Sequence, residues 1–370
     1  MIHGISQIFE KLIKNTISRH SGFVIPNLTA KDLKSNMVLS LTLLFFYSNI
    51  NAQWTKQNSN TDASFRSIQA ISDKIVWAGG TKGTMLKTED GGQKWQVLKV
   101  AGAENLDFRD IQVLDKNTVI AMSAGEGEKG AAKIFKTTDG GANWQVVFET
   151  TEKGTFFDSI DFWNKKEGLL IGDPIDNKPF ILKTTDGGLT WNRISKDKLP
   201  DIQEAEASFA ASGTCVIAKG KSAWICTQKR VFFTHDKGET WSVTETKFTK
   251  GQTSGIFGLH FTNNKTGFAV GGDYKNDKQA IDNVAVTNDG GISWTMLTPT
   301  KPDGLKESSW LVNDKTLVTV GTSGTGVSKD LGKTWEVFDT QPFHAISCYK
   351  NTCWTIGGRG SVAKASFLNN

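Results

Sequence analysis

One nine-residue motif recurs six times along this 370-residue chain and sets its period. A representative copy is Lys136-Thr-Thr-Asp-Gly-Gly-Ala-Asn-Trp144, and each copy keeps a hydroxyl residue, an Asp, a Gly and a Trp at fixed offsets. The Asp can accept turn N–H groups, the Gly can take a positive φ and the Trp opens a new strand, which predicts a hairpin turn. A residue needed in every repeat is expected to fold the repeat, so we predict a structural role without catalysis for these aspartates. They are Asp90, Asp139, Asp186, Asp236, Asp289 and Asp330.

The spacing of the motif predicts the blades of a β-propeller. Successive motif aspartates are 49, 47, 50, 53 and 41 residues apart, which is typical of four-stranded blades. Three strands are expected before each motif: an innermost strand that begins near a Phe, a second that ends in small residues and a third that leads into the turn. Innermost strands are expected near residues 65–68, 108–111, 156–160, 209–212 and 343–346.

The C-terminal end of the repeat region lacks the fourth strand of a blade, and the N-terminal end supplies one such strand. The last unit, Phe343 to Phe367, supplies three strands without a motif, whereas Gln53-Trp-Thr-Lys56 resembles the start of a fourth strand. We therefore predict that residues 53–370 form an all-β, seven-bladed propeller of four-stranded antiparallel blades, with the N-terminal strand closing the last blade. The alternative, a six-bladed ring with a C-terminal extension, leaves the Trp54 strand unpaired.

The N-terminal region has the layout of a secretory signal. An apolar run over residues 37–47 follows Lys31 and Lys34 and precedes a small, polar stretch that ends at Ala52. The run is too short to span a bilayer comfortably, and a buried core helix is less expected because no partner helices follow. We predict that residues 1–52 are a leader and signal peptide, and that the mature chain is periplasmic or extracellular, without a membrane span. Their removal leaves 38 basic and 36 acidic residues without a basic run, which argues against nucleic-acid binding.

The cysteine count allows two disulfides. An even number of cysteines in an exported chain favours bridges, and each pair is expected to face across a hairpin. Four buried free thiols are the alternative. We expect no metal site, because neither pair has zinc-knuckle spacing and histidines are scarce. The two pairs are Cys215 with Cys226 and Cys348 with Cys353.

The connection lengths predict where function resides. The turns between first and second strands are short and lie on the same face as the repeated motifs, whereas the long connections emerge on the opposite face. Variable loops on a rigid scaffold are the usual place for binding. The alternative is a solvated polar rim without a ligand. The candidate binding residues at the channel mouth and on the loop-rich face are Arg66, Arg109, Asp158, Asp173, Asp176, Glu204, Glu206, Arg230, Asp273, Tyr274 and His344.

Two enzyme classes fit the residues less well than a binding protein. The motif resembles the Asp-box of the bacterial neuraminidase (BNR) repeat families, whose sialidases use three arginines, a Tyr nucleophile with a Glu partner, and an acid/base Asp. Residues 53–370 hold only five arginines and two tyrosines. An oxidoreductase would need a cofactor site, and neither a Gly-x-Gly-x-x-Gly turn before a helix nor Cys-x-x-Cys-His occurs. We therefore expect no catalytic residue and no cofactor, with an extracytoplasmic sialidase-type hydrolase or oxidoreductase as the alternative.

Several segments resemble the photosystem II stability and assembly factor family and its relatives in non-photosynthetic bacteria. They are residues 156–162, 167–174 and 182–191, with further similarity to the bacterial branch at 206–214, 254–258 and 270–274. The resemblance implies a seven-bladed propeller that scaffolds a membrane-protein complex through an arginine-bearing face. Arg66 and Arg109 match the Phe-Arg strand openings of the family, whereas Phe157, Ala210 and His344 occupy the corresponding positions of other blades. We predict an exported, non-catalytic scaffold whose partner is a protein, such as a membrane-protein complex or an envelope protein.

Overall fold

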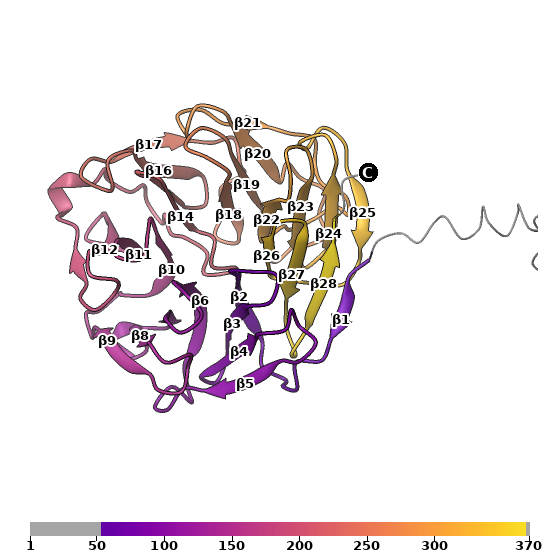
Figure 1. The fold of residues 1–370 in the computed structure, drawn as a ribbon. Coiled ribbons are helices and arrows are strands. Elements are labelled where there is room, and N and C mark those ends of the chain that lie inside the picture. Colours follow the sequence, from indigo (N-terminus) through magenta and orange to yellow (C-terminus); the bar gives the residue numbers. More distant parts are fainter. Residues whose placement is uncertain (1–52, 368–370) are drawn as a thin grey trace, which may run out of the picture. The chain divides into compact units, whose positions relative to one another are not determined.

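The computed structural model describes residues 53–367, which form seven four-stranded antiparallel sheets arranged in a ring (Figure 1). The prediction of a seven-bladed propeller is confirmed. The first strands of successive blades contact one another around the centre of the ring. The predicted leader and signal peptide, residues 1–52, lies outside the described residues. No helix within residues 53–367 is long and apolar enough to cross a membrane.

Each of the first three blades is one continuous four-stranded meander. Blade 1 consists of β2 (Phe65–Ala70), β3 (Val76–Gly80), β4 (Thr84–Thr88) and β5 (Gln96–Lys99). Blade 2 consists of β6 (Asp107–Val113), β7 (Val119–Ala124), β8 (Lys133–Thr137) and β9 (Gln145–Glu149), with a 3₁₀ turn at Gly127–Lys129. Blade 3 consists of β10 (Phe157–Phe162), β11 (Gly168–Ile175), β12 (Lys178–Thr184) and β13 (Asn192–Arg193), followed by a 3₁₀ turn at Lys196–Lys198.

The remaining blades follow the same order, except that the last is built from both ends of the described chain. Blade 4 consists of β14 (Val216–Lys219), β15 (Ser222–Cys226), β16 (Arg230–Thr234) and β17 (Ser242–Glu245). Blade 5 consists of β18 (Ser254–Phe261), β19 (Gly267–Asp273), β20 (Val284–Thr287) and β21 (Thr295–Met296). Blade 6 consists of β22 (Ser308–Leu311), β23 (Leu317–Gly321), β24 (Gly324–Ser328) and β25 (Glu336–Asp339). Blade 7 consists of β26 (Ala345–Tyr349), β27 (Thr352–Ile356), β28 (Val362–Ser366) and β1 (Thr55–Gln57).

The N-terminal strand closes the ring as predicted, because β1 pairs with β28 in antiparallel register. Trp54, which precedes β1, is only 7% exposed. Its Nε1 atom donates a 2.8 Å hydrogen bond to Thr325 Oγ1 of blade 6. Its indole packs edge-on against the rings of Phe338, Phe343 and Phe367. The six-bladed alternative is therefore wrong.

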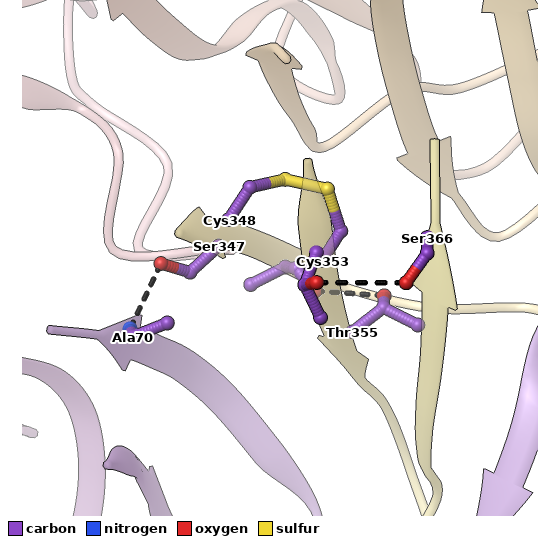
Figure 2. The surroundings of a disulfide bond; sticks show 8 residues. Ala70, Ser347, Cys348, Cys353, Thr355 and Ser366 are labelled. Atoms are coloured by element: carbon purple, nitrogen blue, oxygen red, sulfur yellow. Dashed lines mark hydrogen bonds between the residues drawn. A yellow bond between two sulfur atoms is a disulfide. The ribbon is translucent and has the colours of Figure 1, made fainter. Parts of the chain in front are cut away.

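A disulfide joins Cys348 and Cys353 across the hairpin of β26 and β27 (Figure 2). These two residues are direct partners in the strand register, with their Cα atoms 4.0 Å apart. That spacing is typical of the closer, non-hydrogen-bonded pairs of an antiparallel ladder. The neighbouring Ser347 Oγ accepts a 3.0 Å hydrogen bond from the Ala70 N–H of blade 1. The bridged hairpin thus also lies at the seam between the last blade and the first.

The repeated motifs form hydrogen-bonded turns of one geometry. At Asp139, one carboxylate oxygen accepts bonds of 2.8 Å from Thr137 Oγ1 and 2.9 Å from the Asn143 N–H. The Gly141 N–H donates in turn to Thr137 Oγ1 at 3.0 Å. Gly141 has a φ of +91°, and a Cβ there would lie about 3 Å from the Trp77 ring of the preceding blade. The motif therefore fixes both the turn and its packing against the neighbouring blade.

One predicted innermost strand is absent. Residues 209–212 do not pair within blade 4, whose first strand, β14, begins only at Val216. The side chains at 210–212 are small, and Gly213 turns the backbone at a φ of +66°. A Cβ at Gly213 would lie 2.4 Å from Asp110 Oδ1 of blade 2, so the backbone passes close to the opposite wall of the channel. Phe209–Thr214, called here the crossing segment, leaves the sheet and traverses the channel.

Candidate functional site

Most innermost strands contain a bulge at the channel mouth, and the residue at the bulge differs from blade to blade. In blades 1, 2, 3 and 5 the register between first and second strands shifts at one residue. Such β-bulges re-aim a side chain and are common beside functional sites. In blades 6 and 7, Glu307 and His344 directly precede the innermost strands. The bulged residues are Arg66, Arg109, Asp158 and Phe257.

Blade 4 contributes the crossing segment in place of a bulge. Arg109 Nη1 donates a 2.8 Å hydrogen bond to the Ala210 carbonyl, and Arg66 Nη1 donates one of 3.4 Å to the Ala211 carbonyl. Ser212 Oγ donates to the Glu307 carbonyl of blade 6 at 2.7 Å. The segment that leads into blade 4 is thus held by blades 1, 2 and 6 and roofs the channel on the loop-rich face.

Arg66, Glu307 and His344 form one ionic cluster at this mouth. Glu307 Oε2 lies 3.4 Å from Arg66 Nη1 and 2.7 Å from His344 Nδ1. His344 Nδ1 also lies 3.3 Å from Arg66 Nη1, so all three side chains contact one another. Burial lowers the pKa of Arg66, while the Glu307 charge opposes that shift. Sequence reasoning missed Glu307, although it precedes Ser308 in blade 6 as Arg66 precedes Ser67 in blade 1.

A second cluster combines Arg109 with the buried Asp158 and the partly buried Asp107 and Asp173. Arg109 Nε lies 2.6 Å from Asp107 Oδ2. Asp158 is 2% exposed, and its Oδ2 atom has no hydrogen-bond partner among residues 53–367. Burial, followed by the Asp173 carboxylate and Cys215, raises the pKa of Asp158, whereas Arg109 lowers it. Burial also raises the pKa of Asp173 to about 6. Burial and mutual repulsion therefore disfavour a state in which both acids are charged.

An aromatic group flanks the crossing segment on the side of blade 5. The rings of Phe209 and Phe257 stack with their centroids 4.1 Å apart. Tyr274 meets Phe209 edge-on at 6.2 Å and is 51% exposed. The mouth therefore offers two guanidinium groups and one accessible aromatic surface around a roof of small residues.

Glu206 and Arg230, both predicted as binding residues, are engaged with each other instead. Glu206 is 4% exposed and Arg230 is 9% exposed. Arg230 Nε donates to both carboxylate oxygens of Glu206, which also accepts a hydrogen bond from Thr227 Oγ1. Because a buried bidentate pair leaves few free donors, these residues hold the loop before the crossing segment.

Three further predicted residues lie outside the mouth clusters. Asp176 pairs with Lys196. The Glu204 carbonyl accepts a hydrogen bond from Lys250 Nζ, and Asp273 accepts one from the Lys275 N–H of its own turn. Among the described residues, no group of three or more His, Cys, Asp or Glu side chains is arranged to hold a metal ion.

The second predicted disulfide is not formed, since Cys215 and Cys226 are buried free thiols. The Cys226 N–H donates a 2.9 Å hydrogen bond to the Cys215 carbonyl. Such hydrogen-bonded pairs have the wider spacing of an antiparallel ladder. The Cys215 thiol lies 2.8 Å from the Phe209 carbonyl, at the start of the crossing segment. This prediction was therefore wrong for one pair, whereas the other pair is bridged.

Comparison with known proteins agrees with the family resemblance. Residues 127–205 match the model of the family described as photosynthesis system II assembly factor YCF48. No curated protein matches the chain. A solved structure titled YCF48 bound to D1 peptide is 16% identical with a TM-score of 0.60, covering 85% of this chain and 97% of that one. YCF48 from Cyanidioschyzon merolae is 16% identical with a TM-score of 0.63, covering 85% and 99%.

An enzyme shares the architecture as well. The GH74 xyloglucanase from Xanthomonas campestris is 13% identical with a TM-score of 0.59, and the match covers 84% of this chain but 53% of the enzyme. At such identities a structural likeness establishes the fold alone, and any activity has to be argued from the site.

Proposed function

We propose that the protein, a member of the photosystem II assembly factor-like family of BNR-repeat propellers, binds an extended segment of a protein partner at the channel mouth. The proposal rests chiefly on the hydrogen bonds that arginines at the mouth donate to the chain's own backbone. Arg66 and Arg109 each donate to a main-chain carbonyl of the crossing segment, yet their side chains remain 28% and 29% exposed.

The remaining donors of these arginines suit a peptide. A guanidinium has five N–H donors in a fixed fork, and only some are used by Asp107, Glu307 and the two alanine carbonyls. Carbonyl or carboxylate groups of a partner's segment can accept hydrogen bonds from the guanidinium N–H groups that remain free. Tyr274 adds an exposed aromatic side chain, and Tyr and Arg are the residue types that dominate protein interfaces. The related YCF48 structure with a bound D1 peptide supports this kind of ligand.

We further propose a bacterial, exported assembly scaffold whose partner is an envelope protein or a membrane-protein complex. The segment over residues 31–52 supports export, because it has the three-part layout of a signal peptide. The Cys348–Cys353 bridge also supports it, since disulfides persist in oxidising compartments. N-terminal sequencing of the chain from fractionated cells tests this point. Recovery of the uncleaved chain in the cytoplasmic fraction would contradict it.

Photo-crosslinking on the two faces of the ring tests the binding proposal. A benzoylphenylalanine at position 274 is expected to capture one discrete partner from extracts of the source cells. The matched control carries the same group at Leu189, which is also 51% exposed but lies in a motif turn on the opposite face. Adding Arg66→Glu and Arg109→Glu to the Tyr274 variant should abolish the adduct without loss of the folded state, as checked by circular dichroism. Equal adducts from both faces would refute the proposal.

A glycoside hydrolase is the second candidate, because a xyloglucanase shares the architecture and two acids meet at the mouth. An acid catalyst must contact the glycosidic oxygen and its partner must reach the sugar. Asp158 is 2% exposed beneath its neighbours, which argues against this role. Release of reducing sugar from xyloglucan, lost in Asp158→Asn and Asp173→Asn, would favour the hydrolase over the binder.

A further inference from the structure

The central channel contains a cavity beneath the crossing segment. Its volume is about 230 Å³, and the innermost strands of the seven blades line its wall. Ser212, Gly213 and Thr214 of the crossing segment form its closed end. At the other end, next to the short turns between first and second strands, Lys219 is exposed. The cavity is therefore a blind pocket that opens on the face opposite the proposed peptide site.

One polar side chain in this pocket lacks a partner. Gln112 of β6 lines the cavity and is 8% exposed, and its amide has no hydrogen-bond partner among residues 53–367. Its amide atoms keep solvent access through the cavity, so they can hydrogen-bond to a molecule that occupies it. Gln69 beside it uses Oε1 to accept the Val113 N–H, which leaves its NH₂ group unused. Two amides on adjacent blades thus offer donors and an acceptor to the cavity.

The opposite wall of the pocket is aromatic. The Trp310 and His260 rings lie 4.8 Å apart, and both line the cavity. Burial, with the nearby Lys219 charge, lowers the pKa of His260 to about 3, so its imidazole is neutral and offers one donor and one acceptor. The indole contributes an apolar face beside these polar atoms.

The formal charges of the lining largely cancel. Lys219 is attracted to the Asp161 carboxylate, and its Nζ donates to the Phe261 carbonyl at 3.2 Å. Both Asp161 oxygens accept backbone N–H groups, from Phe162 and Ala218. Asp110, at the closed end, is saturated by four hydrogen bonds. The two acids therefore have their oxygens occupied by hydrogen bonds, and the charge of Lys219 at the open end is offset by Asp161.

We propose that this pocket binds a neutral polyhydroxylated molecule of about the size of one sugar ring. Each hydroxyl group both donates and accepts, as do the Gln112 amide and the His260 ring, and a sugar's C–H face can pack on Trp310. The volume lies below the roughly 300–1,000 Å³ of pockets for drug-sized ligands, which suits a monosaccharide or small polyol. This site is separate from the proposed peptide site and lies at the other end of the channel.

Ligand-observed NMR with the full chain tests the proposal, using glucose, galactose, N-acetylglucosamine and glycerol, with glycine and acetate as charged comparators. At least one neutral probe is expected to bind saturably. Gln112→Leu should weaken that binding about two- to tenfold, the effect of one neutral hydrogen bond, and Trp310→Leu should weaken it as well. Gln96→Leu, the same change at an exposed position of β5, should leave it unaltered.

The leucine variant also separates a lost contact from a lost fold. Because the Gln112 side chain makes no hydrogen bond within residues 53–367, Gln112→Leu breaks no protein hydrogen bond, and its thermal midpoint should stay close to that of the parent. Absence of saturable binding for every neutral probe would overturn the proposal, as would binding of the charged comparators alone. Undiminished sugar binding by a folded Gln112→Leu protein would also overturn it, because the sugar would then lie elsewhere.

Discussion

The Nη1 atom of Arg109 donates a 2.8 Å hydrogen bond to the carbonyl oxygen of Ala210, 101 positions further along the chain. This bond connects a bulge in blade 2 to the crossing segment, which precedes blade 4, at the mouth of the channel. The same guanidinium pairs with Asp107 and lowers the pKa of Asp158. Arg109 thus both holds the crossing segment and sets the electrostatic environment of the acids at the channel mouth.

Replacing Arg109 should loosen the roof without unfolding the propeller. Arg109→Met keeps an unbranched apolar stem but removes the charged donor to the Ala210 carbonyl, a bond type worth roughly 1.5–3 kcal/mol before allowance for its partial exposure. Amides of residues 209–214 should exchange with deuterium about tenfold faster, as read by mass spectrometry. The matched control is Arg193→Met on β13, where the guanidinium bonds Glu152 and is similarly exposed. Unchanged exchange in the crossing segment would show that Ser212 and Arg66 hold it without Arg109.

The bridged hairpin of blade 7 should contribute to stability in a redox-dependent way. The Cys348–Cys353 bridge spans five positions, so chain-entropy arguments give about 2 kcal/mol for its effect on the unfolded state. The double variant Cys348→Ser, Cys353→Ser should lose about that much in urea unfolding. Reductant should destabilise the parent by a comparable amount and leave the double variant unchanged. A parent protein that is indifferent to reductant would contradict the expectation.

Ring closure should depend strongly on Trp54. Trp54→Ala removes a buried indole that packs against three phenylalanines and bonds Thr325, and should cost about 3–5 kcal/mol in the free energy of unfolding. Trp335→Ala, at the corresponding start of the fourth strand in blade 6, is the control. Its indole is only partly buried, so a smaller loss is expected from the same urea titration. Equal losses would mean that β1 closes the ring without the help of its tryptophan.

The fold was predictable because its signal is repeated. Six copies of the motif each specify the same turn, and Thr137, Asp139 and Gly141 show why the residue types are fixed. The composite blade followed from the likeness of Trp54 to the motif tryptophans. In contrast, residues 209–212 begin with the Phe of an innermost strand, and only the three-dimensional position of Gly213 beside Asp110 shows that they cross the channel.

The candidate site was only partly predictable, because burial cannot be inferred from residue type. Arg66, Arg109 and His344 do meet at the mouth, but Glu206 and Arg230 neutralise each other, and Glu307 was missed. The two cysteine pairs looked equivalent in sequence. They differ in whether the paired residues exchange backbone hydrogen bonds, which depends on strand register.

Acid should weaken the motif turns. The Asn143 backbone N–H and side chain, with Thr137, lower the pKa of Asp139 to about 2, from 3.8. A depressed carboxyl pKa stabilises the fold above the unfolded value and loses that contribution as pH falls from about 4 towards 2. Asp139→Asn keeps one acceptor oxygen but cannot titrate, so its urea midpoint should vary less with pH in this window. Parallel profiles for variant and parent would contradict the assignment.

Titration of Asp110 should change stability with pH in the opposite direction to that of Asp139, and in a different pH range. Burial raises its pKa from 3.8 to about 7, although hydrogen bonds from Ile160, Ser159, Ser67 and Ile111 favour the charged form. Between about pH 4 and 7 the folded state retains a proton that the unfolded state releases, so stability declines as pH rises, by up to about 1.4 kcal/mol per pH unit from this group.

Urea unfolding of Asp110→Asn at several pH values between 4 and 8 isolates this contribution. At pH 4 Asp110 is protonated and carries no charge. The asparagine amide accepts hydrogen bonds from the four donors less well than the acid does, so the variant should be less stable than the parent at this pH. Its decline towards pH 7 should nevertheless be shallower, because one titrating group is gone. Asp115→Asn is the control, since that partly exposed turn carboxylate has a lowered pKa and does not titrate in this window. A variant that declines as steeply as the parent would assign the pH dependence to Asp158, Asp161 and Asp173 instead.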